Sequence, residues 1–359
     1  MAKVVVAMSG GVDSSVAAAL LKDKGYEVTG VTMEVWGGEA LPGDRTRHSC
    51  YGPGEEEDRE DARKVAQVLG IALCTFDLRQ DYRIEVLDYF CREYVLGRTP
   101  NPCIRCNRRV KFDALLRKAR ESELEFDYFA TGHYARVEYD EGRCRYLLKK
   151  AGDRAKDQSY FLFALSQEQL GNSLFPLGNH TKGEVRKMAQ DLGLGVDDKP
   201  ESQDFFAGDY SSLLGKVARP GPILNKAGEI LGEHRGIPFY TIGQRKGLGI
   251  SAGEPLYVIG IDPERNAVVV GGKGEVYGDE LVASQLNWIA LEELKHPIEV
   301  EARIRYRHKE AQAMVIPLEE DKVRVKFREP QMAITPGQAV VFYDNDTVVG
   351  GGTIERTGS

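Results

Sequence analysis

The first 36 residues contain the pattern that constrains the fold most. An apolar run, KVVVAM at 3–8, leads through the small residues SGGVDSS at 9–15 into an alanine-rich stretch that Gly25 ends. A second apolar run, YEVTGVTMEVW, follows at 26–36. Both runs have the length and composition of strands, and the segment between them is typical of a helix. The pattern therefore predicts a strand, a helix and a parallel strand, which is the start of an α/β sheet.

The alternation of strand and helix patterns continues through the first half of the chain. Further helices are expected at 55–70, at 80–96 and after residue 107, and further strands at 72–78 and 126–134. Such alternation is typical of a parallel sheet with helices on both faces. The tetrapeptide TKGE at 181–184 has the pattern of a capping box, so one more helix is predicted from there to Gly193.

After about residue 200 the pattern changes to short β-type runs separated by Gly and Pro. We therefore predict three domains: an α/β catalytic domain at 1–203, a small β-rich middle domain at 204–278 and a C-terminal β-barrel at 279–359. No apolar run has the length of a membrane span, and the N-terminus lacks the pattern of a secretory leader. We expect a cytoplasmic protein with no membrane partner.

Charge and cysteine content limit the partners and the chemistry. The net charge of -7 gives no overall attraction to nucleic acid, so a nucleic-acid partner would have to meet a local basic surface. Residues 105–120 and 303–309 are both rich in Arg and Lys. Six cysteines are too few for a disulfide scaffold in 359 residues, and a reducing compartment would keep them as thiols.

The segment MSGGVDSS at 8–15 suits a phosphate-binding loop. Small residues between a strand and a helix allow backbone N–H groups to surround an anion, and the helix N-terminus adds a favourable dipole. The segment lacks the lysine of the Walker pattern and the spacing of the dinucleotide fingerprint. It resembles instead the PP-loop of ATP pyrophosphatases, which cleave ATP between the α- and β-phosphates. That resemblance implies that the loop holds pyrophosphate and that Asp13 helps to place Mg²⁺.

A second motif, RTPNPCIRCNRRVKFDALL at 98–116, has two cysteines three residues apart among arginines. Positive charge and a helix N-terminus lower the pKa of a thiol from about 8.5, so we expect a reactive cysteine here. From Asn101 to Phe112 the segment matches N-P-x-x-x-C-N-x-x-[IV]-K-F, and the strings ATGHYAR, KDQSYFL, FYTIGQRKGLG and IRYRHKE occur further on. With these motifs the chain resembles, over essentially its whole length, the tRNA 2-thiouridylase family. Members of that family replace the 2-oxygen of the wobble uridine by sulfur.

The resemblance implies a set of site residues. ATP would be bound by Met8, Ser9, Gly10, Gly11, Val12, Asp13, Ser14, Ser15, Met33 and Gly132. Asn101, Pro102 and Cys103 would surround the target base, and the tRNA would also contact His133, Lys156, Asp157, Gln158, Arg305, Tyr306 and Gln338. Lys156 and Arg305 suit phosphate contacts on chemical grounds. For His133, Tyr306 and Asp157 there are also structural interpretations: a bond to backbone groups, core packing and a turn.

The sequence departs from the family pattern at the cysteines. Most members carry Asp where this chain has Cys103, and a second cysteine in an S-x-x-x-C-F motif. The corresponding stretch runs here from Ser202 to Phe206, and Phe206 offers no thiol. Cys106 matches the nucleophile of the family. In one route to sulfur transfer, Cys106 carries a persulfide and Cys103 resolves it by forming a disulfide.

A second route adds Cys50. Cys50, Cys103 and Cys106 would hold three irons of a 4Fe-4S cluster, and the fourth iron would bind hydrosulfide. We favour this route because an open metal position delivers sulfur without consuming an enzyme thiol. A structural zinc ion on Cys103 and Cys106 with Cys50 or His48 is the alternative, but it would leave no sulfur carrier.

The predicted activity is ATP-dependent synthesis of 2-thiouridine in tRNA, with Cys106, Cys103 and Asp13 as catalytic residues. The 2-oxygen of the uridine would attack the α-phosphorus of ATP and release pyrophosphate, and sulfur would then displace AMP from C2. The expected cofactors are ATP and Mg²⁺, with the cluster in the second route. The expected partners are a tRNA anticodon and a sulfur donor, either a persulfide-carrying protein or free sulfide. Two rivals are a PP-loop ligase that activates a small carboxylate and a non-catalytic RNA-binding sensor.

Overall fold

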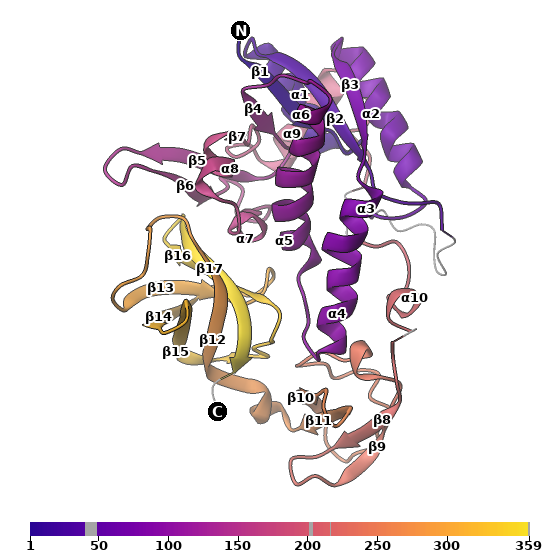
Figure 1. The fold of residues 1–359 in the computed structure, drawn as a ribbon, viewed down its shortest axis with the longest axis vertical. Coiled ribbons are helices and arrows are strands. Elements are labelled where there is room, and N and C mark those ends of the chain that lie inside the picture. Colours follow the sequence, from indigo (N-terminus) through magenta and orange to yellow (C-terminus); the bar gives the residue numbers. More distant parts are fainter. Residues whose placement is uncertain (40–48, 201–203, 216, 358–359) are drawn as a thin grey trace. The chain divides into compact units, whose positions relative to one another are not determined.

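The computed structural model describes residues 1–39, 49–200, 204–215 and 217–357, which form two compact units (Figure 1). The first unit is made by the described residues of Met1–Val86, Cys103–Asp209 and Asp346–Val348. The second is made by those of Leu87–Pro102, Tyr210–Asn345 and Val349–Ser359. None of the helices in the described residues has both the length and the apolar character that crossing a bilayer requires.

A five-stranded parallel sheet is the centre of the first unit, with the strand order β3-β2-β1-β4-β7 (Figure 1). The strands are β1 (Lys3–Ala7), β2 (Glu27–Glu34), β3 (Ala72–Asp77), β4 (Tyr128–Ala130) and β7 (Ser173–Leu174). Val5 of β1 pairs with Thr29 on one side and with Phe129 on the other. The order of the strands thus reverses at β1. In an open parallel sheet, ligands bind at the carboxyl ends of the strands beside such a reversal.

The helices of the first unit follow the predicted alternation. They are α1 (Val12–Asp23), α2 (Glu55–Leu69), α3 (Arg79–Tyr82), η1 (Arg83–Asp88), α5 (Pro102–Cys106), η2 (Asn107–Ala114), α6 (Leu115–Glu121), α7 (Ser159–Leu162), α8 (Gln167–Gly171) and α9 (Lys182–Asp191). Helix α1 packs against α2 and α9, and Val16, Val65 and Val185 are fully buried in their shared core. The capping box is confirmed, because Thr181 and Glu184 accept hydrogen bonds from each other's backbone N–H groups.

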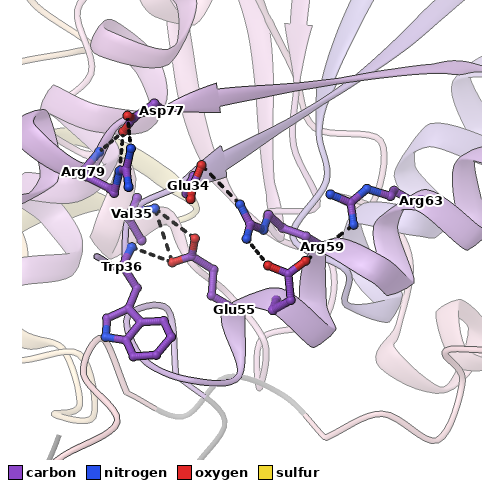
Figure 2. A network of polar contacts seen from close by, with 9 residues as sticks. Glu34, Val35, Trp36, Glu55, Arg59, Arg63, Asp77 and Arg79 are labelled. Carbon is purple, nitrogen blue, oxygen red and sulfur yellow. Dashed lines mark hydrogen bonds and ion pairs between the residues drawn. The ribbon is translucent and has the colours of Figure 1, made fainter. Parts of the chain in front are cut away.

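Glu55 ties the start of α2 to the end of β2 (Figure 2). Its carboxylate accepts hydrogen bonds from the backbone N–H groups of Val35 at 3.1 Å and Trp36 at 2.7 Å. Burial raises the pKa of Glu55 to about 7, although these two bonds and the nearby Arg59 act in the opposite direction. The link fixes the path of the chain directly after Met33, one of the predicted ATP contacts.

A β-hairpin completes the first unit. It consists of β5 (Ala135–Asp140) and β6 (Arg145–Lys150), and Cys144 lies exposed in its turn. Lys149 of β6 pairs with Thr347. Arg136 of β5 also binds the carboxylate of Asp346 at 2.6 Å.

The second unit contains α4 (Tyr89–Val95), α10 (Ser211–Leu214) and two β structures. The smaller has the order β10-β11-β8-β9. Its elements are β8 (Gly221–Leu224), β9 (Ile230–His234), η3 (Ile237–Phe239), β10 (Tyr257–Asp262), β11 (Ala267–Gly271) and η4 (Lys273–Val276). Ile223, Val258 and Val268 form its core.

The larger β structure of the second unit is a barrel. Its strands are β12 (Tyr277–Trp288), β13 (Ile298–Arg303), β14 (Ala311–Leu318), β15 (Lys322–Met332), β16 (Ala339–Asp344) and β17 (Thr347–Thr357). They follow the order β12-β15-β14-β13-β16-β17, and pairing of β12 with β17 closes the barrel around Val315, Val325 and Phe342. The predicted fold class is confirmed, while the exact boundaries at residues 203 and 278 stay a prediction.

Candidate active site

The predicted phosphate loop joins β1 to α1, beside the reversal of strand order (Figure 1). Gly10 has a φ of +72°, and a Cβ atom there would lie 2.0 Å from the backbone oxygen of Asp58. The hydroxyls of Ser14 and Ser15 donate to the carbonyl oxygen of Gly11, and the N–H of Ser9 donates to Ser14 Oγ at 3.1 Å. These contacts hold the loop at the N-terminus of a 12-residue helix, which suits anion binding.

Two predicted loop residues, Met8 and Val12, are only 2% and 3% exposed and belong to the core of the first unit. Their side chains therefore anchor the loop to the hydrophobic core of the first unit. Ser9, Gly11 and Asp13 are more accessible than these two. Met33 lies near the end of β2, the strand beside β1.

Gly132 follows β4, on the other side of the reversal. A Cβ atom there would lie 2.6 Å from Ser14 N and 2.7 Å from the carbonyl carbon of Asp13. Only glycine therefore allows this segment to approach the start of α1 so closely. Tyr134, two residues on, donates its hydroxyl proton to Asp13 Oδ1 at 2.8 Å. The structure thus brings together Gly132, Asp13 and Ser14, as the resemblance implied.

The carboxylate of Asp13 also has a cationic partner. Lys182 Nζ lies 2.8 Å from each of its two oxygens, and the Lys182 side chain is 12% exposed. Lys182 is the first residue of α9 and lies 169 positions further along the chain. Lys182 was not among the predicted site residues. The one signal for it in the sequence is the capping box, which places residue 182 at the start of a helix.

The predicted thiol site combines Cys103 and Cys106 of α5 with Cys50 from a distant segment. The N–H of Cys50 donates to the carbonyl oxygen of Asp204 at 3.2 Å, and Ala207 N donates to Tyr51 O at 3.0 Å. Cys50 therefore lies beside the stretch in which the second cysteine of the family is missing. The thiolate of Cys50 interacts electrostatically with both Cys103 and Cys106.

The expectation of a lowered thiol pKa in this segment is wrong for this structure. Burial raises the pKa of Cys103 to about 12 and that of Cys106 to about 11. Arg105, one of the expected activating charges, is paired with Glu85 at 2.5 Å. Lys111 is the group that lowers both thiol pKa values, and its effect is smaller than that of desolvation.

Aromatic rings occupy the position of the missing cysteine. Phe206 is fully buried, and its ring stacks on Tyr51 with a centroid distance of 5.7 Å. Tyr51 stacks in turn on Tyr82, whose hydroxyl donates to Phe205 O at 3.2 Å. Ser202 of the motif, and His48 of the zinc alternative, lie outside the described residues. Within the described ranges, no group of three His, Cys, Asp or Glu side chains is arranged to hold a metal ion.

The predicted tRNA contacts of the first unit are mostly engaged with protein groups. Asp157 is 4% exposed, and its carboxylate accepts bonds from Ala151 N, Ser159 N and Ser159 Oγ. This arrangement favours the structural interpretation of Asp157. His133 Nδ1 lies 2.7 Å from the hydroxyl of Thr131, and burial lowers its pKa well below the usual value. Gln158 accepts a bond from Tyr134 N, and Lys156 is half-buried.

One predicted tRNA contact of the second unit, Gln338, holds the residues that precede the base-binding segment. Gln338 Nε2 donates to the carbonyl oxygens of Thr99 at 2.9 Å and Pro100 at 3.1 Å, directly before Asn101 and Pro102. Thr99 N donates in turn to Pro336 O at 2.8 Å. The barrel therefore fixes the residues that lead into the N-P-x-x-x-C motif.

Arg305 and Tyr306 lie in the basic segment 303–309 of the same unit. The guanidinium of Arg305 donates to Ile242 O at 3.1 Å and to the hydroxyl of Thr335. The guanidinium of Arg303 lies over the ring of Tyr306, 5.2 Å from its centroid. Both predicted tRNA contacts therefore have structural roles in the protein itself.

Known proteins resemble this chain over its whole length. The family model of the tRNA methyl transferase HUP domain matches residues 2–207, that of the tRNA methyl transferase PRC-barrel domain matches 214–272, and that of the aminomethyltransferase beta-barrel domain matches 278–354. The tRNA-specific 2-thiouridylase MnmA of Pelotomaculum thermopropionicum is 50% identical, with 99% of this chain and 98% of that protein covered. MnmA 1 of Caldanaerobacter subterraneus subsp. tengcongensis and MnmA 2 of Thermoanaerobacter sp. are each 51% identical with the same coverage. The chain therefore belongs to the tRNA-specific 2-thiouridylase family.

Proposed function

We propose that this protein is a tRNA 2-thiouridine synthase that uses ATP to activate the 2-oxygen of a wobble uridine and then replaces that oxygen by sulfur. The observation that carries the proposal is 50% identity, over 99% of the chain, with a tRNA-specific 2-thiouridylase. The cytoplasmic location predicted from the sequence stays a prediction.

Activation takes place at the start of α1. The 2-oxygen of the uridine forms a bond to the α-phosphorus of ATP, and the bond from that phosphorus to the α,β-bridging oxygen breaks with its electron pair on pyrophosphate. Backbone N–H groups at the helix N-terminus bind the phosphates. The carboxylate of Asp13 supplies the oxygen ligands that Mg²⁺ prefers. Gly132 supports the proposal because it lets a second segment close against Asp13 and Ser14.

The base is bound by Asn101, Pro102 and Cys103. An unpaired base in a tRNA loop can leave its stack and enter a protein pocket at a small energetic cost. The two hydrogen bonds of Gln338 to Thr99 and Pro100 hold the segment that leads to this pocket. Gln338 thus contributes as a positioning residue, in addition to any contact with the tRNA body.

Sulfur reaches the base by one of the two predicted routes, either from a persulfide on Cys106 or from an iron held by the cysteines. In the persulfide route, the outer sulfur of a Cys106 persulfide attacks C2 and AMP leaves. The thiolate of Cys103 then attacks Cys106 Sγ, forming a disulfide, and the S–S bond to the transferred sulfur breaks with its electron pair on the sulfur bound to C2. In the cluster route, Cys50, Cys103 and Cys106 would hold a 4Fe-4S cluster, and its open iron position would supply hydrosulfide as the sulfur source. Thiolates are the usual ligands of such a cluster, and the bond of Cys50 N to Asp204 O brings Cys50 beside the stretch that lacks the second cysteine, but the three thiols are not arranged to hold a metal ion in the described residues.

Metal analysis distinguishes the two routes. Protein purified without oxygen should contain about four irons and four sulfides per chain if the cluster route holds. The C50A variant should lose them, whereas C144A, which removes an exposed thiol from the hairpin turn, should retain them. Protein without iron or sulfide would leave the persulfide route, and zinc alone would favour the structural zinc site.

The proposed activity is tested with purified protein, Mg²⁺-ATP and a tRNA transcript under anaerobic conditions, with sulfide as the sulfur source in one reaction and a persulfide-carrying protein in a parallel one. We expect pyrophosphate release that depends on the tRNA, together with 2-thiouridine in the digested product. D13N should abolish both. Pyrophosphate release that depends on a small carboxylic acid instead of tRNA would favour the ligase, and binding of ATP and tRNA without pyrophosphate would favour the sensor.

A further inference from the structure

The unusual feature of the candidate site is the ion pair of Asp13 and Lys182. The phosphate loop contains no lysine, yet an ammonium group lies 2.8 Å from both carboxylate oxygens of its only acidic residue. With Tyr134 also bound to Oδ1, the carboxylate has two donors around it. A metal ion that binds this carboxylate would compete with the ammonium for the same two oxygen atoms.

The position of Lys182 is fixed by its own helix. The capping box of Thr181 and Glu184 sets the first turn of α9, and Lys182 N donates to Asp153 Oδ2 at 3.2 Å. Val185 and Ala189 of the same helix are fully buried, and α9 packs against α1. The backbone of residue 182 is therefore held beside α1, while its flexible side chain can move its ammonium by a few ångströms.

The surroundings of the ammonium suit an anion of high charge. The Lys182 side chain is 12% exposed, and charge-assisted hydrogen bonds gain strength where water is excluded. The group also lies at the N-terminus of α1, whose N–H groups and dipole favour phosphate. A lysine in P-loop proteins acts on phosphate as a point charge, and here a lysine of another helix reaches Asp13 in the first turn of α1.

We propose that Lys182 supplies the positive charge that the loop lacks and binds the β- and γ-phosphates of ATP, with Asp13 transferred from Lys182 to Mg²⁺ as the nucleotide enters. When the α,β-bridging bond breaks, the electron pair stays on pyrophosphate, and Lys182 stabilises the charge that develops there. No proton is transferred. The inference rests on the proposed ATP-dependent function and adds a residue to it.

The test measures equilibrium binding of pyrophosphate, of α,β-methylene-ATP with Mg²⁺ and of AMP. K182Q should weaken the first two by about ten- to a hundredfold, the effect of losing one charged hydrogen bond, and should change AMP affinity less than twofold. K187Q is the matched control, because Lys187 lies in the same helix, is 73% exposed and pairs with Asp191 at the surface. It should bind all three ligands like the wild type.

D13N separates a direct role from a structural one. Breaking the pair from the other side leaves the ammonium in place, so D13N should bind pyrophosphate without Mg²⁺ at least as tightly as the wild type. Equal losses in K182Q and D13N would overturn the inference, and so would wild-type affinity in K182Q. If K182Q alone does not fold, the double variant D13N/K182Q, in which neutral groups replace the ion pair, is compared with D13N for pyrophosphate binding. A wild type that binds neither pyrophosphate nor the ATP analogue would instead refute the proposed function.

Discussion

The close approach of the phosphate loop to α2 makes Gly10 sensitive to a single methyl group. G10A combines two costs: a positive φ of +72° that L-residues disfavour by about 1–2 kcal/mol, and a Cβ atom 2.0 Å from the backbone oxygen of Asp58. Relief of that overlap requires the loop or the helix to shift, at about 1–3 kcal/mol. We expect G10A to lower the free energy of unfolding by about 2–5 kcal/mol and to abolish binding of the ATP analogue.

Two other glycines that flank α1 serve as controls for G10A. Gly25 has a φ of +82°, and a Cβ atom there would have no other atom within 4 Å, so G25A carries the backbone cost alone, about 1–2 kcal/mol. Gly11 has a φ of -92°, and its Cβ would make an ordinary contact with Ser9 Oγ at 3.6 Å, so G11A should leave stability nearly unchanged. Urea unfolding followed by circular dichroism measures all three. Equal losses in G10A and G25A would refute the argument from the Asp58 contact.

Two further predictions concern the base-binding segment and the end of β2. Q338A removes two hydrogen bonds to Thr99 and Pro100, worth about 1–2 kcal/mol together. It should lower kcat/KM for tRNA about five- to thirtyfold and leave binding of the ATP analogue unchanged. Q312A, on the exposed face of β14, should not lower kcat/KM. For Glu55 the folded chain has a raised pKa of about 7, so it binds more protons than the unfolded chain between about pH 4.5 and 7. The contribution of Glu55 to stability should therefore fall as pH rises through this range. The unfolding free energy of the wild type should accordingly decrease relative to that of E55Q, and a difference independent of pH would contradict the assignment.

Much of the fold could be predicted from the sequence because its signals are local. The strand, loop and helix at the N-terminus follow from residue composition over about twenty positions, and the capping box at Thr181 needs only four. Gly10 and Gly132 were predicted as ATP contacts from the family motifs. Those contacts stay a prediction, and the structure shows why glycine is needed at both positions, which is close approach to Asp58 and to Ser14.

The remaining features of the site depend on contacts between distant segments. Lys182 meets Asp13 across 169 positions, and the N–H of Cys50 donates to the carbonyl oxygen of Asp204, which also lies far along the chain. The pKa of Cys106 was predicted in the wrong direction because neighbouring arginines are visible in a sequence, whereas burial is not. The hydrogen bond from Gln338 to Thr99 O likewise joins two residues that lie far apart in the sequence, so no local pattern predicts it.

The most direct test of the central claim follows the 2-oxygen of the uridine. A tRNA labelled with ¹⁸O at that position is incubated with Mg²⁺-ATP, a sulfur source and the protein, and the AMP produced is analysed by mass spectrometry. Attack of the 2-oxygen on the α-phosphorus predicts one ¹⁸O atom in each AMP, in equal number to the 2-thiouridine formed. AMP without the label, accompanied by labelled water or by no 2-thiouridine, would contradict adenylation of the base.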